Sequence, residues 1–307
     1  MKIRTRAAFA AGSFVAIAAA PLAAQAGVLD TWNLLVFGNH QISSNVEGRV
    51  LVRGNLTGTG DVGTRLTPSG NFVGQDTLLV GGNINVGNIQ LQAGNLRRTG
   101  TRTGNINFNG GGSDIVNASA LATANSAHTE VIGISNFLAS QTATNTVNIP
   151  GGQPAGLTIN ATPRPDGVAI ISIPGGIFSS GNVQSLNLNF NGATSVIFNV
   201  SGTSVNFTGA NFVGQLANAS NASRILWNFN AATTINVQRQ LTGAFIAVNA
   251  NVTNTSTIIG TTAVNNFTQN GQVHVPLYTG YIPAPGAVGL LGLAGLMVGP
   301  IGGRRRR

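Results

Sequence analysis

The chain has 307 residues and no cysteine, and only 7% of its residues are charged. The lack of cysteine excludes disulfides, thiol nucleophiles and cysteine-based metal sites, so the folded chain must be stabilised by burial and hydrogen bonding alone. A hydrophobic content of 42% with so few charges excludes intrinsic disorder and is typical of an ordered, β-rich protein.

The formal net charge of +9 is concentrated at the two ends of the chain. Seven of the 16 basic residues lie there, namely Lys2, Arg4, Arg6, Arg304, Arg305, Arg306 and Arg307. The rest of the chain has nine arginines and seven acidic residues, which leaves a nearly neutral body. This distribution excludes nucleic acid as a partner, because a nucleic-acid-binding domain gathers its basic residues on one surface.

The N-terminus has the three-part pattern of a secretory signal peptide. Basic residues are followed by an apolar run at 7–20, by Pro21, and by the small residues Ala24 and Ala26 around Gln25. The alternative is an N-terminal transmembrane anchor, but the run is shorter than the ~20 residues that a span needs. We therefore expect signal peptidase to remove residues 1–26.

Short runs of alternating apolar residues recur from Trp32 onward and end at Gly or Gly-Asn. They are residues 33–38, 46–56, 78–87, 104–110, 183–190, 196–200, 205–207, 225–229, 234–237, 244–248, 258–260 and 273–275. The phrase apolar-x-Gly-(Gly)-Asn-apolar occurs at 52–56 and at 80–84, which is a loose internal repeat. Such a repeat favours a β-helix, whose coils stack on one another, while the spacing of the runs also fits a β-sandwich. Gly and Asn suit the corners of a β-helix, where stacked Asn side chains can hydrogen-bond between coils.

Residues 114–140 are rich in alanine and predict one or two α-helices beside the β body. Ser113 or Asp114 could cap the first helix. The expected apolar face consists of Ile115, Leu121, Ala122, Val131, Ile132, Phe137 and Leu138. The Gly- and Pro-rich stretch 150–167 predicts a loop or a hairpin connection. Nothing in the composition separates a second domain, so we expect residues 27–280 to form one.

Residues 281–307 combine three features in a fixed order. Pro283, Ala284 and Pro285 break the chain, an apolar stretch follows at 286–303, and the four arginines end it. The uninterrupted apolar part, 287–298, would cover roughly 18 Å as a helix, against a hydrocarbon core of about 30 Å. We expect the arginines to stay in the cytoplasm and stop translocation. The segment would then retain the chain temporarily rather than anchor it permanently.

This segment resembles a PEP-CTERM sorting signal of Gram-negative bacteria, with Ala284 at the position of the usual glutamate. The resemblance implies cleavage by an exosortase-type membrane protease and delivery to the cell surface or the extracellular matrix. The substitution at Ala284 leaves open whether the segment is cleaved.

The body resembles the choice-of-anchor A family of bacterial surface proteins. The matching motifs occur in order at residues 32–38, 46–50, 80–83, 135–139, 224–229, 243–247 and 271–274. The resemblance implies an adhesive β-helix domain that different bacteria carry on different surface anchors. It does not imply a ligand.

No convergent set of titratable groups indicates catalysis. The seven acidic residues are well separated along the sequence, and a pairing of Asp61 with Asp76 across coils is the one arrangement that would suit a polysaccharide lyase or hydrolase. The three histidines, His40, His128 and His274, lack metal-ligand spacing. We therefore expect neither a metal nor another cofactor.

Two local patterns could bind ligands. Arg97, Arg98 and Arg102 form a basic cluster that could meet an acidic polysaccharide, or could be a solvated loop. Alternating threonines at 57–59 and 99–103 could bind ice on a flat β-solenoid face, but in the sequence these rows do not recur at a coil period.

The sequence thus predicts a mainly β protein, a β-helix with one flanking helical segment. We expect a secreted, non-enzymatic adhesin or structural protein at the surface or in the matrix of a Gram-negative bacterium. A polysaccharide-active enzyme and an ice-binding protein are the alternatives. The expected partners are signal peptidase, an exosortase-type protease, a polysaccharide or another surface ligand, and the membrane through the C-terminal segment before processing.

Overall fold

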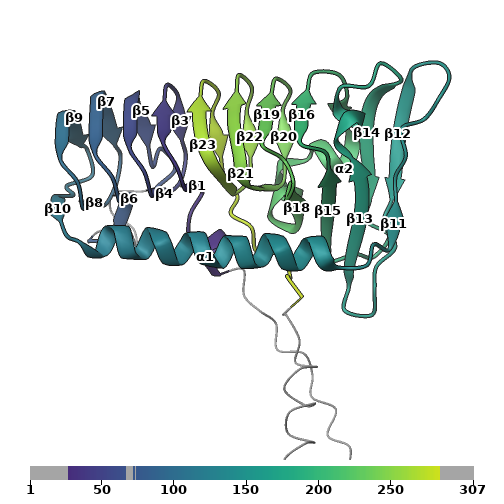
Figure 1. Cartoon of the computed structure of the whole chain (residues 1–307), viewed down its shortest axis with the longest axis horizontal. Coiled ribbons are helices and arrows are strands. Elements are labelled where there is room, and N and C mark those ends of the chain that lie inside the picture. Colours follow the sequence, from purple (N-terminus) through teal and green to yellow (C-terminus); the bar gives the residue numbers. More distant parts are fainter. Residues whose placement is uncertain (1–26, 67–71, 73, 284–307) are drawn as a thin grey trace, which may run out of the picture. The chain divides into compact units, whose positions relative to one another are not determined.

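The paired strands of the protein run parallel to one another and stack as a β-helix (Figure 1). The computed structural model describes residues 27–66, 72 and 74–283. The predicted signal peptide and residues 284–307 lie outside this part of the chain. No helix within the described residues is both long and apolar enough to cross a membrane. The predicted β-helix is confirmed, and the β-sandwich alternative is wrong.

The strands fall into two groups separated by one long helix. Before the helix come β1 (Leu34–Val36), β2 (His40–Ile42), β3 (Asn45–Val46), β4 (Val50–Val52), β5 (Leu56–Val62), β6 (Asp76–Val80), β7 (Ile84–Leu91), β8 (Asn95–Arg98), β9 (Arg102–Phe108) and β10 (Asp114–Val116). After it come β11 (Asn145–Thr146), β12 (Ala155–Asn160), β13 (Val168–Pro174), β14 (Val183–Asn189), β15 (Ser195–Ser201), β16 (Ser204–Phe207), β17 (Asn211–Phe212), β18 (Ile225–Asn228), β19 (Thr234–Val237), β20 (Leu241–Thr242), β21 (Ala244–Asn254), β22 (Ile258–Ile259), β23 (Thr262–Gln269) and β24 (Val273–His274). The helices are η1 (Gly27–Asp30), α1 (Ser119–Ser140), η2 (Gly175–Phe178), α2 (Gly214–Ala217) and η3 (Ala219–Arg224).

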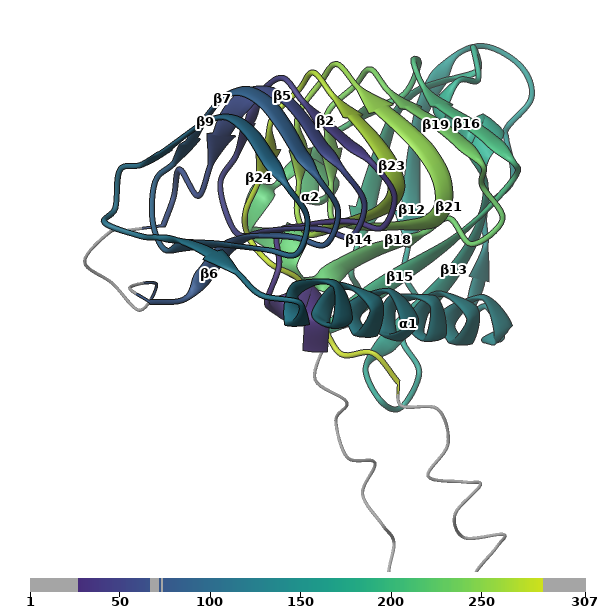
Figure 2. The ribbon, with the colours of Figure 1, turned by 60° about the vertical axis from the view of Figure 1, so that its left-hand side comes forward.

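The coils present three faces, which we number in the order in which a coil passes through them (Figure 2). The first face stacks β11, β13, β15, β18, β21, β23, β1, β4, β6, β8 and β10. The second face stacks β16, β19, β21, β23, β2, β5, β7 and β9. The third face stacks β20, β22, β24 and β3 on the later parts of β5, β7 and β9, and β12, β14 and β17 form a separate small sheet.

The described domain both begins and ends in the middle of the stack. It winds outward from β1 to β10, returns along α1 to β11, and winds back to β24 (Figure 1). Strands β1 and β2 therefore pair with β23, and β3 pairs with β24. We call this junction between the first and the last coil the seam.

Helix α1 covers the first face because the outward side chains of that face are apolar. They include Leu35, Leu51, Leu79, Ile197, Leu226 and Ile246, which form one buried cluster with Ala120, Ala124, Ala127, Val131 and Leu138 of the helix. At 1.5 Å per residue, its 22 residues extend about 33 Å along the stack. Near the C-terminal end of the helix, the Ser135 hydroxyl donates to Asn228 Oδ1 at 2.7 Å, and Asn199 Nδ2 donates to the Leu138 carbonyl at 2.7 Å.

The structure corrects three details of the sequence analysis. Asp114 does not cap the helix, since it lies in β10, which pairs with β8, and the helix begins only at Ser119. Leu121 and Ala122 are exposed, and small alanines lie against the sheet instead. The stretch 150–167 is not only a connection, because it contains strand β12, which pairs with β14.

Aromatic side chains fill the interior where the first face is covered by the C-terminal half of the helix. Phe198 and Trp227 occupy register-paired positions with their rings stacked at 4.0 Å. Trp227 is fully buried, and its Nε1 donates to the Thr242 carbonyl at 2.9 Å, so its one polar atom is satisfied. The apolar pentad 244–248 is buried throughout, which confirms that this strand is covered on both sides.

The repeated Gly-Asn phrase is the corner between the first and second faces. A Cβ on Gly54 would collide with the Gly38 carbonyl oxygen, and one on Gly82 would collide with the Gly54 carbonyl oxygen. Only glycine therefore lets successive coils approach closely enough for the Gly54 and Gly82 amides to donate to those carbonyls, at 2.9 and 3.0 Å. The internal repeat is thus a packing requirement of the stack.

A buried histidine lies at the seam. His40 points into the interior between Phe267 of β23 and Leu56 of β5, with its Nε2 3.0 Å from Gln269 Oε1. Its ring stacks on that of Phe267 at 5.6 Å, and its Nδ1 has no hydrogen-bond partner among the described residues. Burial lowers the pKa of His40 from 6.5 to about 4.

We predict that His40 makes the folded protein less stable as the pH falls from 6.5 to 4. In this window the unfolded chain binds a proton at His40 and the folded chain does not, so the free energy of unfolding decreases by about 3 kcal/mol. Urea titrations of the full-length protein at pH 7, 5.5 and 4 measure this loss.

The His40→Gln variant should lose that part of the pH dependence, while a His274→Gln variant at the partly exposed His274 should keep it. His128, whose pKa is lowered by burial and by Arg53, remains in both variants. Identical pH dependence in wild type and His40→Gln would contradict the prediction.

Candidate functional site

The second face carries two outward columns of uncharged polar side chains, one residue per coil in each. The corner column consists of Ser204, Thr234, Asn251, Asn266, Asn39, Asn55, Asn83 and Thr101. The face column, two residues further along each strand, consists of Asn206, Asn236, Thr253, Thr268, Gln41, Thr57, Asn85 and Thr103. Strand spacing places successive members of a column about 4.8 Å apart.

The corner column stabilises the stack itself. The side-chain Oδ1 of Asn39 accepts the backbone N–H of Asn55 at 3.0 Å, and Oδ1 of Asn55 accepts that of Asn83 at 2.8 Å. Asn266 and Asn83 act in the same way toward Asn39 and Thr101, at 2.7 and 3.0 Å. The predicted hydrogen bonding between stacked asparagines is confirmed.

The face column differs from the corner column, because three of its central side chains do not use their hydrogen-bonding groups within the described structure. At its ends, Asn236 donates to Asn206 at 2.7 Å and Thr103 donates to Asn85 at 2.9 Å. Between these pairs, the side chains of Thr253, Thr268 and Gln41 make no hydrogen bond to any described residue. This part of the second face can therefore donate to and accept from an external ligand.

The register brings threonines that are distant in the sequence into one column. Thr57 lies in line with Thr268 and Thr253 on one side and with Thr103 two coils away on the other. The sequence hid this alignment because the coils differ in length and because the first coil joins the last. Asn85 and Gln41 interrupt this column, so the threonines share a column but do not recur on every coil.

The basic cluster lies at the β9–β10 end of the stack, and each of its arginines has an acidic partner. Arg97 pairs with Asp76 at 2.6 Å, while Arg98 and Arg102 both pair with Asp114, at 2.8 and 3.1 Å. Arg102 is in register with Ile84, and Asp114 is in register with Leu96, so both occupy positions that point inward in earlier coils. We infer that these ion pairs close the end of the hydrophobic interior.

The other residues considered for catalysis or metal binding do not form a common site in the structure. Asp61 lies on β5 in register with Gln90, whereas Asp76 lies on β6 against Arg97, and no ion pair or hydrogen bond among the described residues joins the two acids. His128 contacts Phe37 with ring centroids 4.6 Å apart, and His274 bonds to Gln272 at 2.7 Å. Within the described residues, no group of three or more potential metal ligands is present.

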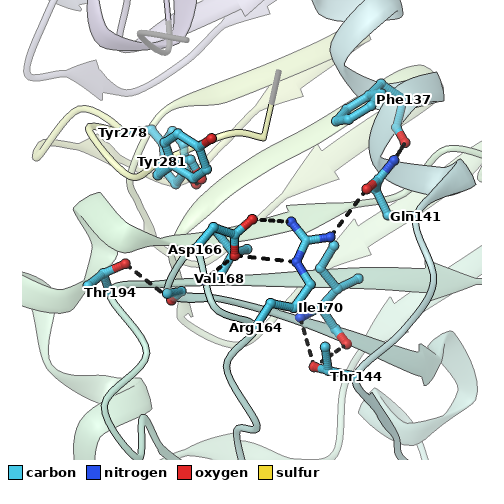
Figure 3. Close-up of polar contacts among 11 residues, drawn as sticks. Phe137, Gln141, Thr144, Arg164, Asp166, Val168, Ile170, Thr194, Tyr278 and Tyr281 are labelled. Atoms are coloured by element: carbon cyan, nitrogen blue, oxygen red, sulfur yellow. Dashed lines mark hydrogen bonds and ion pairs between the residues drawn. The ribbon is translucent and has the colours of Figure 1, made fainter. Parts of the chain in front are cut away.

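A further cluster of polar contacts connects the end of α1 to the loop before β13 (Figure 3). Arg164 pairs with Asp166 at 2.7 Å and donates to Gln141 at 3.3 Å, and Asp166 also accepts the backbone N–H of Val168 at 3.0 Å. The cluster could not be predicted from the sequence, because Gln141 follows α1 whereas Arg164 and Asp166 lie in the loop before β13. Since the charged groups satisfy one another, we assign it a structural role.

Comparison with known protein families identifies the domain. Residues 25–275 match the family model described as "Putative Ice-binding-like adhesive domain". The chain belongs to this family of ice-binding-like adhesive domains. No curated protein matches it.

Two solved structures resemble this family member. One is an ice-binding protein from an Antarctic biological consortium, with 16% identity and a TM-score of 0.42, covering 88% of this chain and 97% of the other. The second is an ice-binding protein from the Antarctic ascomycete Antarctomyces psychrotrophicus, with 14% identity and a TM-score of 0.39, covering 81% of this chain and 97% of the other.

We predict that Asp114→Asn destabilises the domain by about 1–3 kcal/mol. The substitution leaves Arg98 and Arg102, which are largely buried, without their carboxylate at the end of the interior. Urea denaturation of the full-length protein at pH 7 measures the change.

Asp61→Asn is the matched control, because it removes the same charge from an outward position with no ion pair among the described residues. Its effect should stay within about 0.5 kcal/mol. Equal stability of the two variants would show that the ion pairs do not close the end of the stack.

Proposed function

We propose that the protein is an exported, non-enzymatic adhesin that binds its target through the second face. The observation that carries this proposal is the face column, in which Thr253, Thr268 and Gln41 are neutral, regularly spaced and free of hydrogen bonds to the described residues. Such a surface suits many weak hydrogen bonds to an extended, uncharged target. Membership of an adhesive-domain family supports the same reading.

Both ends of the described domain lie away from the second face (Figure 1). Val28 of η1 donates its backbone N–H to Glu130 of α1 at 2.9 Å, and Tyr278 and Ile282 belong to the apolar cluster beneath that helix. Both ends of the described domain therefore lie at the helix-covered first face (Figure 1). The second face is thus left open to a target by both ends of the described domain.

We further propose that residues 1–26 direct export and that the segment from Pro283 to Arg307 is a PEP-CTERM-type signal processed by an exosortase. The domain would then be a choice-of-anchor A adhesin at the surface or in the matrix of a Gram-negative cell. Support comes from the Pro-Ala-Pro break, the short apolar stretch and the four terminal arginines in that order.

Ice binding is the second candidate function. The alignment of Thr253, Thr268, Thr57 and Thr103 in one column favours it. The Asn and Gln members interrupt the threonines, so the column is not a uniform hydroxyl row. A polysaccharide-active enzyme has less support, because Asp61 lies on the third face of the coils and Asp76 on the first.

We predict that Thr253→Lys combined with Asn85→Lys reduces adhesion by at least about tenfold. The two lysines flank the centre of the face column, and a neutral target would have to bury unpaired charges against them. The measurement is the attachment of cells displaying the full-length protein to polysaccharide-coated surfaces and to hydrophilic glass. Purified protein tested for ice-crystal shaping separates the ice-binding alternative.

Gln184→Lys combined with Gln240→Lys is the matched control, since it places the same charges at exposed positions on or beside strands β14 and β20. This control should attach like wild type. Unchanged attachment of the second-face variant would refute the proposed binding surface. Release of sugar products, lost in Asp61→Ala or Asp76→Ala, would instead favour an enzyme.

Removal of Arg304–Arg307 tests the sorting proposal. We expect the truncated protein to lose retention or processing, which changes its location and intact mass, because the positive charges no longer stop translocation. Intact mass spectrometry and cell fractionation measure both. An Arg239→Gln variant, which removes one arginine from the domain, is the control. Unchanged mass and location after truncation would refute the sorting function.

A further inference from the structure

The second face is hollowed where the first and last coils meet. A shallow, open hollow of about 280 Å³ lies over strands β23, β2 and β5. Asn39, Gln41, Thr57, Asn266 and Thr268 supply its polar lining, and the buried rings of His40 and Phe267 lie beneath them. The hollow thus spans the seam and exists only when the two ends of the domain have come together.

The lining of the hollow has unusual hydrogen-bonding capacity for this surface. The Gln41 amide can accept with its oxygen and donate with its nitrogen, and the Thr268 hydroxyl can do both, while neither bonds to a described residue. The Asn39 oxygen accepts the N–H of Asn55, but the Asn39 amide nitrogen makes no hydrogen bond to a described residue. Elsewhere in the face column, Asn85 with Thr103 and Asn206 with Asn236 satisfy each other.

The chemistry of the lining selects against charged ligands. None of the exposed lining side chains is ionisable, and the arginines that could attract an anion are paired with Asp76 and Asp114 at the end of the stack. A charged ligand would lose hydration without gaining a counter-charge. A ligand with several neighbouring donors and acceptors but no charge would gain bonds from each amide and hydroxyl.

We infer that the seam hollow is a binding subsite for one residue of a neutral polysaccharide. Its volume lies near the lower limit of small-molecule sites, which suits a single sugar ring. Amides that donate and accept side by side match the vicinal hydroxyls of a sugar. The inference rests on the proposed adhesive function, and it specifies the class of target and the position of contact.

The subsite is built for weak binding. Phe267 lies beneath the hollow but is only 1% exposed, so no aromatic face is available to stack on the sugar. Each net hydrogen bond contributes only about 1 kcal/mol. Useful adhesion then depends on many copies of the protein that engage repeated sugars of one polymer.

The test is the binding of purified full-length protein to immobilised dextran, mannan and cellohexaose, with alginate and polygalacturonate as acidic probes. Wild type should bind at least one neutral polymer more tightly than either acidic one. Gln41→Leu combined with Thr268→Val should weaken that binding by at least about tenfold, since it removes the free amide and hydroxyl with little change of shape. Gln184→Leu combined with Thr158→Val, which makes the same two changes at exposed positions of strands β14 and β12 outside the second face, should bind within about twofold of wild type.

The outcomes separate this inference from the proposed function. Full binding by the Gln41→Leu, Thr268→Val variant, together with loss of attachment in the Thr253→Lys, Asn85→Lys variant, would overturn the subsite and leave the adhesive face intact. Preference for alginate or polygalacturonate would also overturn the subsite. Failure of both variants to change attachment would overturn the adhesive face as well.

Discussion

The pairing of strand β23 with strands β1 and β2 is the contact on which the rest of the domain depends. The β-helix is built from two half-stacks, and each would expose its apolar interior at this plane if the other were absent. The register of Leu34 with Thr262, and of His40 with Phe267, makes the interior continuous through the seam. Helix α1 holds the halves in alignment, because it packs on β6 and β8 of one and on β15, β18 and β21 of the other.

Much of the fold follows from local sequence. The Gly-Asn corners were predictable because the backbones of successive coils approach closely at the same place in several coils. The fully apolar pentad 244–248 correctly indicated a strand covered on both sides. The start of the helix was not predictable in the same way. Asp114 suits a helix cap by type, but Arg98 and Arg102 of the preceding coil form ion pairs with it and keep it in a strand.

The candidate site could be predicted only in part. The threonine rows were visible, yet their alignment depends on coils of unequal length and on the seam, where residue 41 lies beside residue 268. The sequence indicated a basic cluster at the three arginines because it does not show which carboxylates pair with them. The sequence also does not show which side-chain amides remain free to bind a ligand. Asn55 and Gln41 look alike in the sequence, but one amide oxygen is used by the next coil and the other remains free.

The path of the chain, which brings the last coil back to the first, also determines when the domain can fold. The partners that close the first coil, residues 262–274, are the last of the body to be synthesised, more than 200 residues after β1. Contacts so distant in sequence form late and slowly, because the intervening chain must first be ordered. A polypeptide threaded through a membrane from its N-terminus would therefore remain unclosed until nearly all of it had crossed. The topology itself postpones folding, which suits the export that we propose for this chain.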